Sequence, residues 1–238
     1  MANLQFPTSQ SQKVSNLWNT DHGLLDEGNY FVSTNPTPLT TVAMTTSVVD
    51  DAATASSTHA QYSPLIYIYN SASATDPNGK TIYLKYIRLL QLTTGQAWTS
   101  CTSAHYTLRL DPTSRYTSGV TATVPVNMNS NSSNNSVAKV YVGANVVSLP
   151  TAAQRLVGRG QIQGSIPLPG DQWIFTFGDV SAPTNVLGAS GIKNLTLPCG
   201  PVAIAPGWSF QVDVFGVALA AAPAFEFEIG HVERVAGL

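Results

Sequence analysis

Residues 201–234 read PVAIAPGWSFQVDVFGVALAAAPAFEFEIGHVER and contain the most regular hydrophobic pattern of the chain. Apolar and polar residues alternate over 208–214, which is the period of a half-buried strand. The alternation returns over 225–229, after a connection rich in small residues at 216–223. The pattern predicts a hairpin-like pair of strands, and such a pair must bury its apolar face against a second sheet to be stable.

The composition is that of a β-rich chain with a neutral, polar exterior. Of the 238 residues, 43% are apolar and only 10% are charged, against roughly a quarter in an average globular protein. A chain of this length fits one all-β domain. A surface with so little charge gives weak repulsion between copies, which favours permanent assembly over life as a free monomer.

Several classes of protein are disfavoured by the charges and the termini. The 11 Lys and Arg are scattered and the net charge is −2, which argues against nucleic-acid binding. No apolar run approaches the roughly 18 residues of a membrane helix. The N-terminal residues lack the basic region and apolar core of a signal peptide, so we expect synthesis in the cytoplasm. Cys101 and Cys199 are predicted to be reduced thiols, or a disulfide if their strands meet.

Strand and turn signals recur along the rest of the chain. Residues 65–70 and 81–93 are predicted strands, and the turn sequence Asp-Pro-Asn-Gly at 76–79 predicts that they form a hairpin. Lys85 and Arg88 would fall on opposite faces of the second strand, which indicates a bulge or a snorkelling side chain. With roughly eight to ten strands and no convincing helix, we predict an antiparallel β-sandwich, jelly-roll-like.

The N-terminal region differs from the predicted sandwich of residues 39–238. Residues 1–38 have no sustained helical or strand period and end in two prolines. We predict an extended arm and connector that orders against the body of the chain or against a neighbouring subunit. The polar run 127–136 is predicted to be an exposed loop.

Catalytic motifs are absent from the sequence, and we expect neither an enzyme nor a cofactor. The four histidines are unclustered, which disfavours a zinc site. Glu226 and Glu228 would lie about 7 Å apart on one strand face. Such a pair is either a catalytic acid and base or, as we favour, surface charge or a subunit contact.

Two further groups have a functional and a structural interpretation. One face of the strand at 104–111 carries three polar residues, His105, Arg109 and Asp111. They either bind an acidic sugar or, as we favour, face solvent. Three tryptophans either form a sugar-stacking platform or belong to the core or an interface; they are Trp98, Trp173 and Trp208.

Three stretches resemble a family of small virion proteins of tailed bacteriophages. They are GNYFVSTNPTP at 28–38, GKTIYLKYIRL at 79–89, and the closing stretch from PVAIAPGWS to PAFEFEIGHVER within 201–234. The chain departs from the family pattern at His231 and Val232, where relatives carry an aromatic pair before Glu-Arg. It also departs at 217–219, where an apolar segment replaces a more polar one.

The resemblance implies a capsid decoration (cement) protein. Such a protein is a β-sandwich, often trimeric, that sits on the outside of the major capsid shell and reaches neighbours with an N-terminal arm. Its partners would be the major capsid protein and further copies of itself, with no nucleic acid and no membrane. The residues expected at the capsid or subunit interface are Trp18, Leu24, Leu25, Tyr30, Phe31, Glu226 and Glu228.

Three alternatives stay open at this point. A tail-spike, tail-fibre or receptor-binding protein would bind host glycans through exposed aromatic residues. A carbohydrate-active enzyme or lectin would have a pocket with paired acids or a metal. A coat protein of a small jelly-roll virus is disfavoured because residues 1–35 carry only Lys13 as a basic residue.

Overall fold

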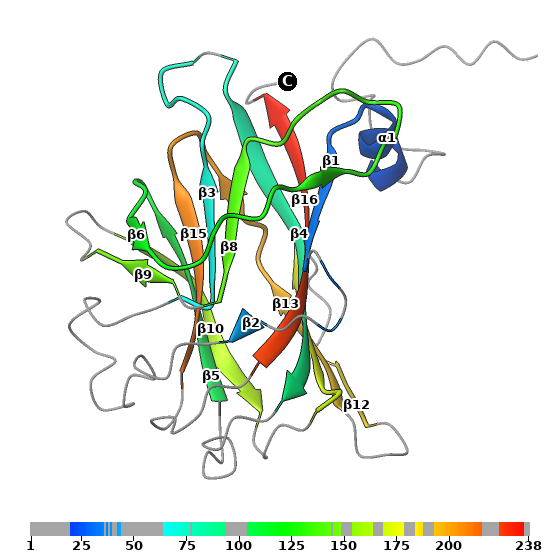
Figure 1. Cartoon of the computed structure of the whole chain (residues 1–238), viewed down its shortest axis with the longest axis vertical. Coiled ribbons are helices and arrows are strands. Elements are labelled where there is room, and N and C mark those ends of the chain that lie inside the picture. Colours follow the sequence, from blue (N-terminus) through cyan, green and yellow to red (C-terminus); the bar gives the residue numbers. More distant parts are fainter. Residues whose placement is uncertain are drawn as a thin grey trace, which may run out of the picture.

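The computed structural model describes residues 20–35, 37, 39, 42–43, 64–76, 78–93, 104–143, 145–148, 154–163, 169–178, 184–187, 193–215 and 224–235. These residues form a β-sandwich with a short helix at one edge (Figure 1). The prediction of an all-β sandwich is therefore confirmed, whereas its jelly-roll connectivity stays a prediction.

The larger sheet has nine strands in the described part of the chain. Seven of them follow in the order β12 (Thr184–Leu187), β13 (Lys193–Cys199), β11 (Gln172–Phe177), β4 (Lys80–Thr93), β16 (Ala224–Val235), β1 (Tyr30–Thr34) and β7 (Val126–Asn127). In addition, β14 (Ala203–Ile204) pairs with β4, and β2 (Val42–Ala43) pairs with β16. Its pairs are antiparallel except for β11 with β13, which run parallel.

The smaller sheet has five described strands in the order β10 (Arg155–Gln163), β5 (Ala104–Asp111), β15 (Ser209–Phe215), β3 (Ile66–Asn70) and β8 (Ala138–Val142). Its pairs are all antiparallel. A third, two-stranded sheet joins β6 (Tyr116–Ser118) to β9 (Val146–Val147).

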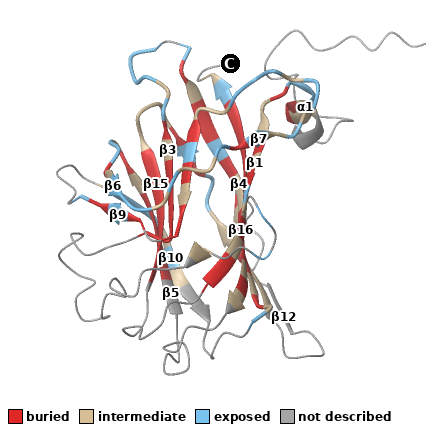
Figure 2. Ribbon diagram, viewed as in Figure 1, coloured by how far each residue is buried: buried red, intermediate tan, exposed pale blue. Residues whose placement is uncertain are grey.

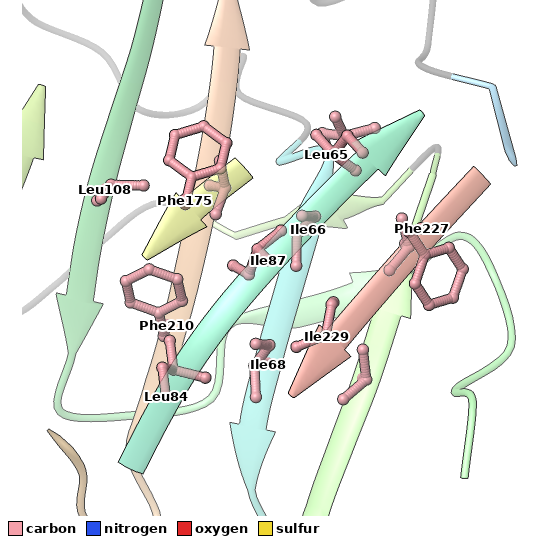
Figure 3. Packing of buried hydrophobic residues seen from close by; sticks show 14 of the residues in the cluster. Leu65, Ile66, Ile68, Leu84, Ile87, Leu108, Phe175, Phe210, Phe227 and Ile229 are labelled. Atoms are coloured by element: carbon pink, nitrogen blue, oxygen red, sulfur yellow. The ribbon is translucent and has the colours of Figure 1, made fainter. Parts of the chain in front are cut away.

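The hydrophobic core lies between the two main sheets. Alternate residues of each strand point inward, as the period of two requires. From the larger sheet come Ile87 of β4 and Ile229 of β16, and from the smaller sheet Ile66 and Ile68 of β3, in one buried cluster (Figure 3). Burial follows the strands of both sheets (Figure 2).

Both hairpin predictions are wrong. The strands β15 and β16 belong to opposite sheets: β15 pairs with β5 and β3, and β16 pairs with β4 and β1. In the same way β3 lies in the smaller sheet and β4 in the larger. Connections of eight or more residues can cross the roughly 10 Å between packed sheets, so neither connection forces its strands to pair. The predicted packing of the two closing strands against a second sheet holds, since the apolar residues of both strands lie in the core between the sheets.

The predicted bulge in β4 is confirmed. Gly230 pairs with Tyr86 and the next residue, His231, pairs with Leu84, so the pairing register between β4 and β16 skips one residue at Lys85. The extra residue shifts the alternation by one position, so Leu84 and Ile87, which are three residues apart, both face the core.

The prediction that the chain has no helix is wrong at α1 (Thr20–Asp26), one short helix inside the predicted arm. Directly after it, β1 pairs with β16 along its whole length. These residues of the predicted arm thus form part of the sandwich, packed against the body of the same chain.

Candidate functional site

The seven predicted interface residues fall into two regions. Leu24 and Phe31 are buried, Leu25, Tyr30, Glu226 and Glu228 are half-buried, and Trp18 lies outside the described residues. The structure brings four of them together at the junction of α1 and β1. The two glutamates lie on the outer face of the larger sheet.

The α1–β1 junction is shaped by a glycine. The amide of Gly28 donates to the carbonyl of Leu25 (2.9 Å) and the amide of Asn29 donates to the carbonyl of Leu24 (2.9 Å). Gly28 has φ 67°, so these bonds form a Schellman cap, which ends the helix and turns the chain into β1. A Cβ on Gly28 would lie 2.1 Å from Oγ of Ser132, so no larger residue fits here.

Phe31 attaches β1 to the core. Its side chain is completely buried, and its ring stacks on that of His231, with centroids 5.6 Å apart and planes at 19°. Nζ of Lys80 lies 6.0 Å from the centre of the Phe31 ring, within reach of a cation–π contact. Phe31 is therefore a core residue of its own chain. In this structure it has no exposed surface with which to make the contact with a capsid subunit that was expected from the sequence.

The loop at 128–136 is largely exposed, as predicted, but asparagine amides attach it to the α1–β1 junction. Nδ2 of Asn127 donates to the carbonyl of Gly28 (2.9 Å), and so does Nδ2 of Asn134 (3.2 Å). Nδ2 of Asn129 donates to the carbonyl of Asp26 (3.1 Å). The composition predicted the exposure, but nothing in the sequence indicated these long-range bonds.

A buried acid links the two sheets close to Phe31. Glu233 of β16 is fully buried, and its Oε1 accepts hydrogen bonds from Oγ of Ser136 (2.5 Å) and from the amide of Val137 (2.9 Å), just before β8. Nε2 of His231 lies 3.3 Å from the same oxygen, and Nζ of Lys80 lies 3.8 Å from Oε2. Burial raises the pKa of Glu233, but the bonds from His231, Ser136 and Val137 outweigh it, so the net shift is downward.

This Ser–His–Glu group differs from a nucleophilic triad. In a triad the two nitrogens of the histidine contact the serine and the acid separately. Here Nε2 of His231 lies near both Ser136 and Glu233, at 3.3 Å from each, and Ser136 donates directly to the acid. The geometry supports a structural link between the sheets. The alternation that continues from Ile229 to His231 and Glu233 was the sequence signal for their inward position.

Glu226 and Glu228 each have a partner on the outer face. Glu228 accepts a hydrogen bond from the hydroxyl of Tyr86 (2.5 Å) and forms an ion pair with Arg88. Glu226 accepts a hydrogen bond from the backbone amide of Leu39. Burial and the bond to Glu228 raise the pKa of the Tyr86 phenol. Each carboxylate is therefore engaged separately, in hydrogen bonds to the chain itself.

The predicted solvated face of β5 is wrong for two of its three residues. Arg109 and Asp111 are buried, and the side chain of His105 lies outside the described residues. Arg109 pairs with Asp213 of β15 (3.4 Å), and Asp111 pairs with Arg115. Thr107 and Gln211 also donate to Asp213, so charges on neighbouring strands neutralise each other in a covered polar layer.

The carboxylates of this layer respond differently to burial. Burial raises the pKa of Asp213, and its bonds to Arg109, Gln211 and Thr107 offset this only in part. For Asp111 the bonds from Arg115 and Thr113 outweigh the effect of burial, so its pKa lies below the ordinary value. Sequence reasoning missed Asp213 and Gln211 because their alternation in β15 predicted a solvent-facing side.

The other candidate groups do not gather into a site within the described residues. Trp173 is part of the core, Trp208 is half-buried with the guanidinium of Arg155 4.8 Å from its ring centre, and Trp98 lies outside that part of the chain. No group of three or more His, Cys, Asp and Glu side chains able to hold a metal occurs among the described residues. Cys199 is a free thiol, and burial raises its pKa to about 11.

Comparison with protein-family models, curated proteins and solved structures finds no match to this chain. Among the helices that the structure describes, none has the length and apolar character needed to cross a membrane.

Proposed function

We propose that this chain is a structural protein of a tailed-bacteriophage virion, and that it binds the outside of the major capsid shell as a decoration (cement) protein. The proposal draws on the three sequence stretches that resemble small phage virion proteins and on the β-sandwich fold. It assigns the chain a mechanical role on the capsid exterior, with the major capsid protein as its partner and no cofactor.

The observation that carries the proposal is the attachment of the N-terminal region to the larger sheet. Residues 1–19 precede α1, and α1 is followed at once by β1, which pairs with β16 and inserts Phe31 into the core. A pull on the N-terminal residues would therefore be transmitted through β1 to β16, one of the long strands of the larger sheet. A decoration protein that holds its neighbours through an arm needs such a connection.

Attachment in many copies makes a modest contact sufficient. A specific interface buries about 1,200–2,000 Å² in total, and capsid symmetry repeats each contact many times over. The low content of charged residues suits surfaces that stay in permanent contact. In this account the added contacts resist the internal pressure of packaged DNA.

A second candidate is a tail-associated or receptor-binding protein that binds host glycans. The observation that favours it is a pair of tyrosines on the outer face of the larger sheet: Tyr30 and Tyr83 lie on either side of Val232 in one cross-strand row, and Tyr83 is 37% exposed. Aromatic side chains with an exposed ring stack on sugars.

Copy number in purified virus particles separates the two candidates. Quantitative mass spectrometry of particles, with the major capsid protein as the internal standard, gives the number directly. A decoration protein is expected in hundreds of copies, whereas a tail protein follows the low symmetry of the tail with on the order of ten copies. A copy number near ten would contradict the capsid assignment and favour the tail.

A further inference from the structure

In one segment of the chain the apolar side chains are exposed, and the residues between them face the protein. Residues 120–128, which we call the crossing segment, run from the edge of the smaller sheet to the edge of the larger sheet (Figure 1). The amide of Thr123 donates to the carbonyl of Val140 in β8 (2.7 Å), and the amide of Met128 donates to the carbonyl of Tyr30 in β1 (3.0 Å). The crossing segment therefore bonds to both sheets on one side of the sandwich.

The apolar side chains of the crossing segment point away from the protein. Val124 is 80% exposed, Val126 66% and Met128 52%. The residues between them face the protein: Pro125 is buried and Asn127 is half-buried. Alternate residues of an extended chain share a face, so the three apolar side chains form one strip on the surface.

The stretch of chain that contains this strip is uncharged. No residue from 116 to 138 carries a charge, a run of sequence that includes the crossing segment and the loop that follows it. A charged surface that meets its own copy across a twofold axis brings like charges together, whereas an uncharged apolar strip does not. The strip is thus compatible with itself, and water is removed from it at little cost.

We propose that the crossing segment is the contact surface for a second copy of this chain, strip against strip about a twofold axis. Val124, Val126 and Met128 form the centre of the contact, and the Thr and Asn residues that flank them form its polar rim, in the arrangement common to interfaces. Contact is made through side chains, because Pro125 has no amide to donate to a further strand.

This inference is independent of the proposed function. It rests on the exposure and neutrality of the crossing segment, so a protein that dimerises in solution without binding capsids would support it and contradict the decoration role. A twofold contact gives a dimer, and the trimer that the phage resemblance implies would need a second, different surface.

Charge substitutions at Val126 test the contact. Light scattering after size exclusion should give twice the chain mass of 25.2 kDa for the full chain. Val126→Lys and Val126→Glu should each weaken association at least tenfold, since each places like charges opposite one another. An equimolar mixture of the two variants should associate again, because Lys then meets Glu across the axis.

A matched control is Leu156→Lys, which changes an apolar side chain of similar exposure (55%) in β10, the edge strand at the other end of the smaller sheet. Leu156→Lys should associate like the unsubstituted chain and give the same mass in light scattering. The proposal is overturned if the full chain stays at 25.2 kDa, if Val126→Lys associates like the unsubstituted chain, or if the mixture fails to restore association. Unchanged melting temperatures of the variants confirm that they fold.

Discussion

At the scale of single residues, Glu233 is a buried acid whose hydrogen bonds link the two sheets. Replacing it by Gln keeps an oxygen to accept from Val137 and Ser136 but removes the charge that faces Lys80 and His231. Lys80 is partly exposed and can turn to water, so no buried charge is stranded. We expect Glu233→Gln to lower the free energy of unfolding at neutral pH by about 1–3 kcal/mol, measured by urea denaturation.

The loss should depend on pH in one direction. The pKa of Glu233 is lowered by folding from its ordinary value of 4.5, so its stabilising effect is present above that pH and disappears as the pH falls through the lower, folded value. The difference in unfolding free energy between the unsubstituted chain and Glu233→Gln should therefore shrink below pH 4.5. The matched control is Glu226→Gln on the same strand, which should cost less than about 1 kcal/mol. Equal losses at the two sites would contradict the role given to Glu233.

Gly230 is a second position where one residue decides local structure. A Cβ there would lie 2.3 Å from Cε1 of Tyr86, so the Tyr86 ring covers the glycine in the cross-strand pair. Gly230→Ala should displace the ring, break its bond to Glu228 and cost about 1–3 kcal/mol of unfolding free energy. The raised pKa of the Tyr86 phenol should also fall, which ultraviolet titration measures. A variant with unchanged stability and titration would show that the ring does not rest on the glycine.

At the scale of elements, β1 is anchored in the sandwich by the buried side chain of Phe31. Phe31 is fully buried between the sheets, and truncation of a buried phenylalanine costs about 3–5 kcal/mol. We expect that loss for Phe31→Ala in urea denaturation, together with faster hydrogen exchange of the β1 amides. Thr34→Ala, an exposed position on the same strand, should change the unfolding free energy by less than about 0.5 kcal/mol. A small effect of Phe31→Ala would mean that β1 contributes little to the sandwich.

The elements also show what alternation in a sequence can and cannot predict. Alternation predicted β15 and β16 because each strand packs one apolar face against the core. It also predicted the irregularity at Lys85, because a strict period of two would have buried a charged side chain. It could not find the partners of a strand, since both closing strands bury the same kind of face and their connection is long enough to change sheets. A short hairpin turn of two to five residues would have fixed the pairing.

The predictions about the candidate site succeeded where the period of a single strand decides the position of a side chain, and failed where a contact outside that strand decides it. The outward position of Glu226 and Glu228 followed from the period of β16, and the structure has both half-buried on that face. The burial of Arg109 did not follow, because it depends on Asp213 in the distant strand β15. The burial of Asp111 did not follow either, because its partner Arg115 lies four residues later, where the period of β5 has ended. A strand with one polar face has the same alternating sequence pattern whether water or other polar residues cover that face.

At the scale of the whole molecule, the structure changes how the N-terminal region should be tested. Removing residues 1–34 would delete α1 and β1 and expose the core beside β16, so a loss of capsid binding could come from unfolding alone. Removing residues 1–19 leaves both elements in place. The shorter deletion therefore separates attachment from folding.

The most direct test of the proposed role is the occupancy of capsids by the full chain and by the chain that lacks residues 1–19, measured by co-sedimentation with purified capsids stripped of this protein. We expect the full chain to sediment with the capsids, and the shortened chain to stay in solution with an unchanged melting temperature. Failure of the full chain to bind would contradict the decoration role, and equal occupancy by both chains would contradict attachment through the N-terminal residues.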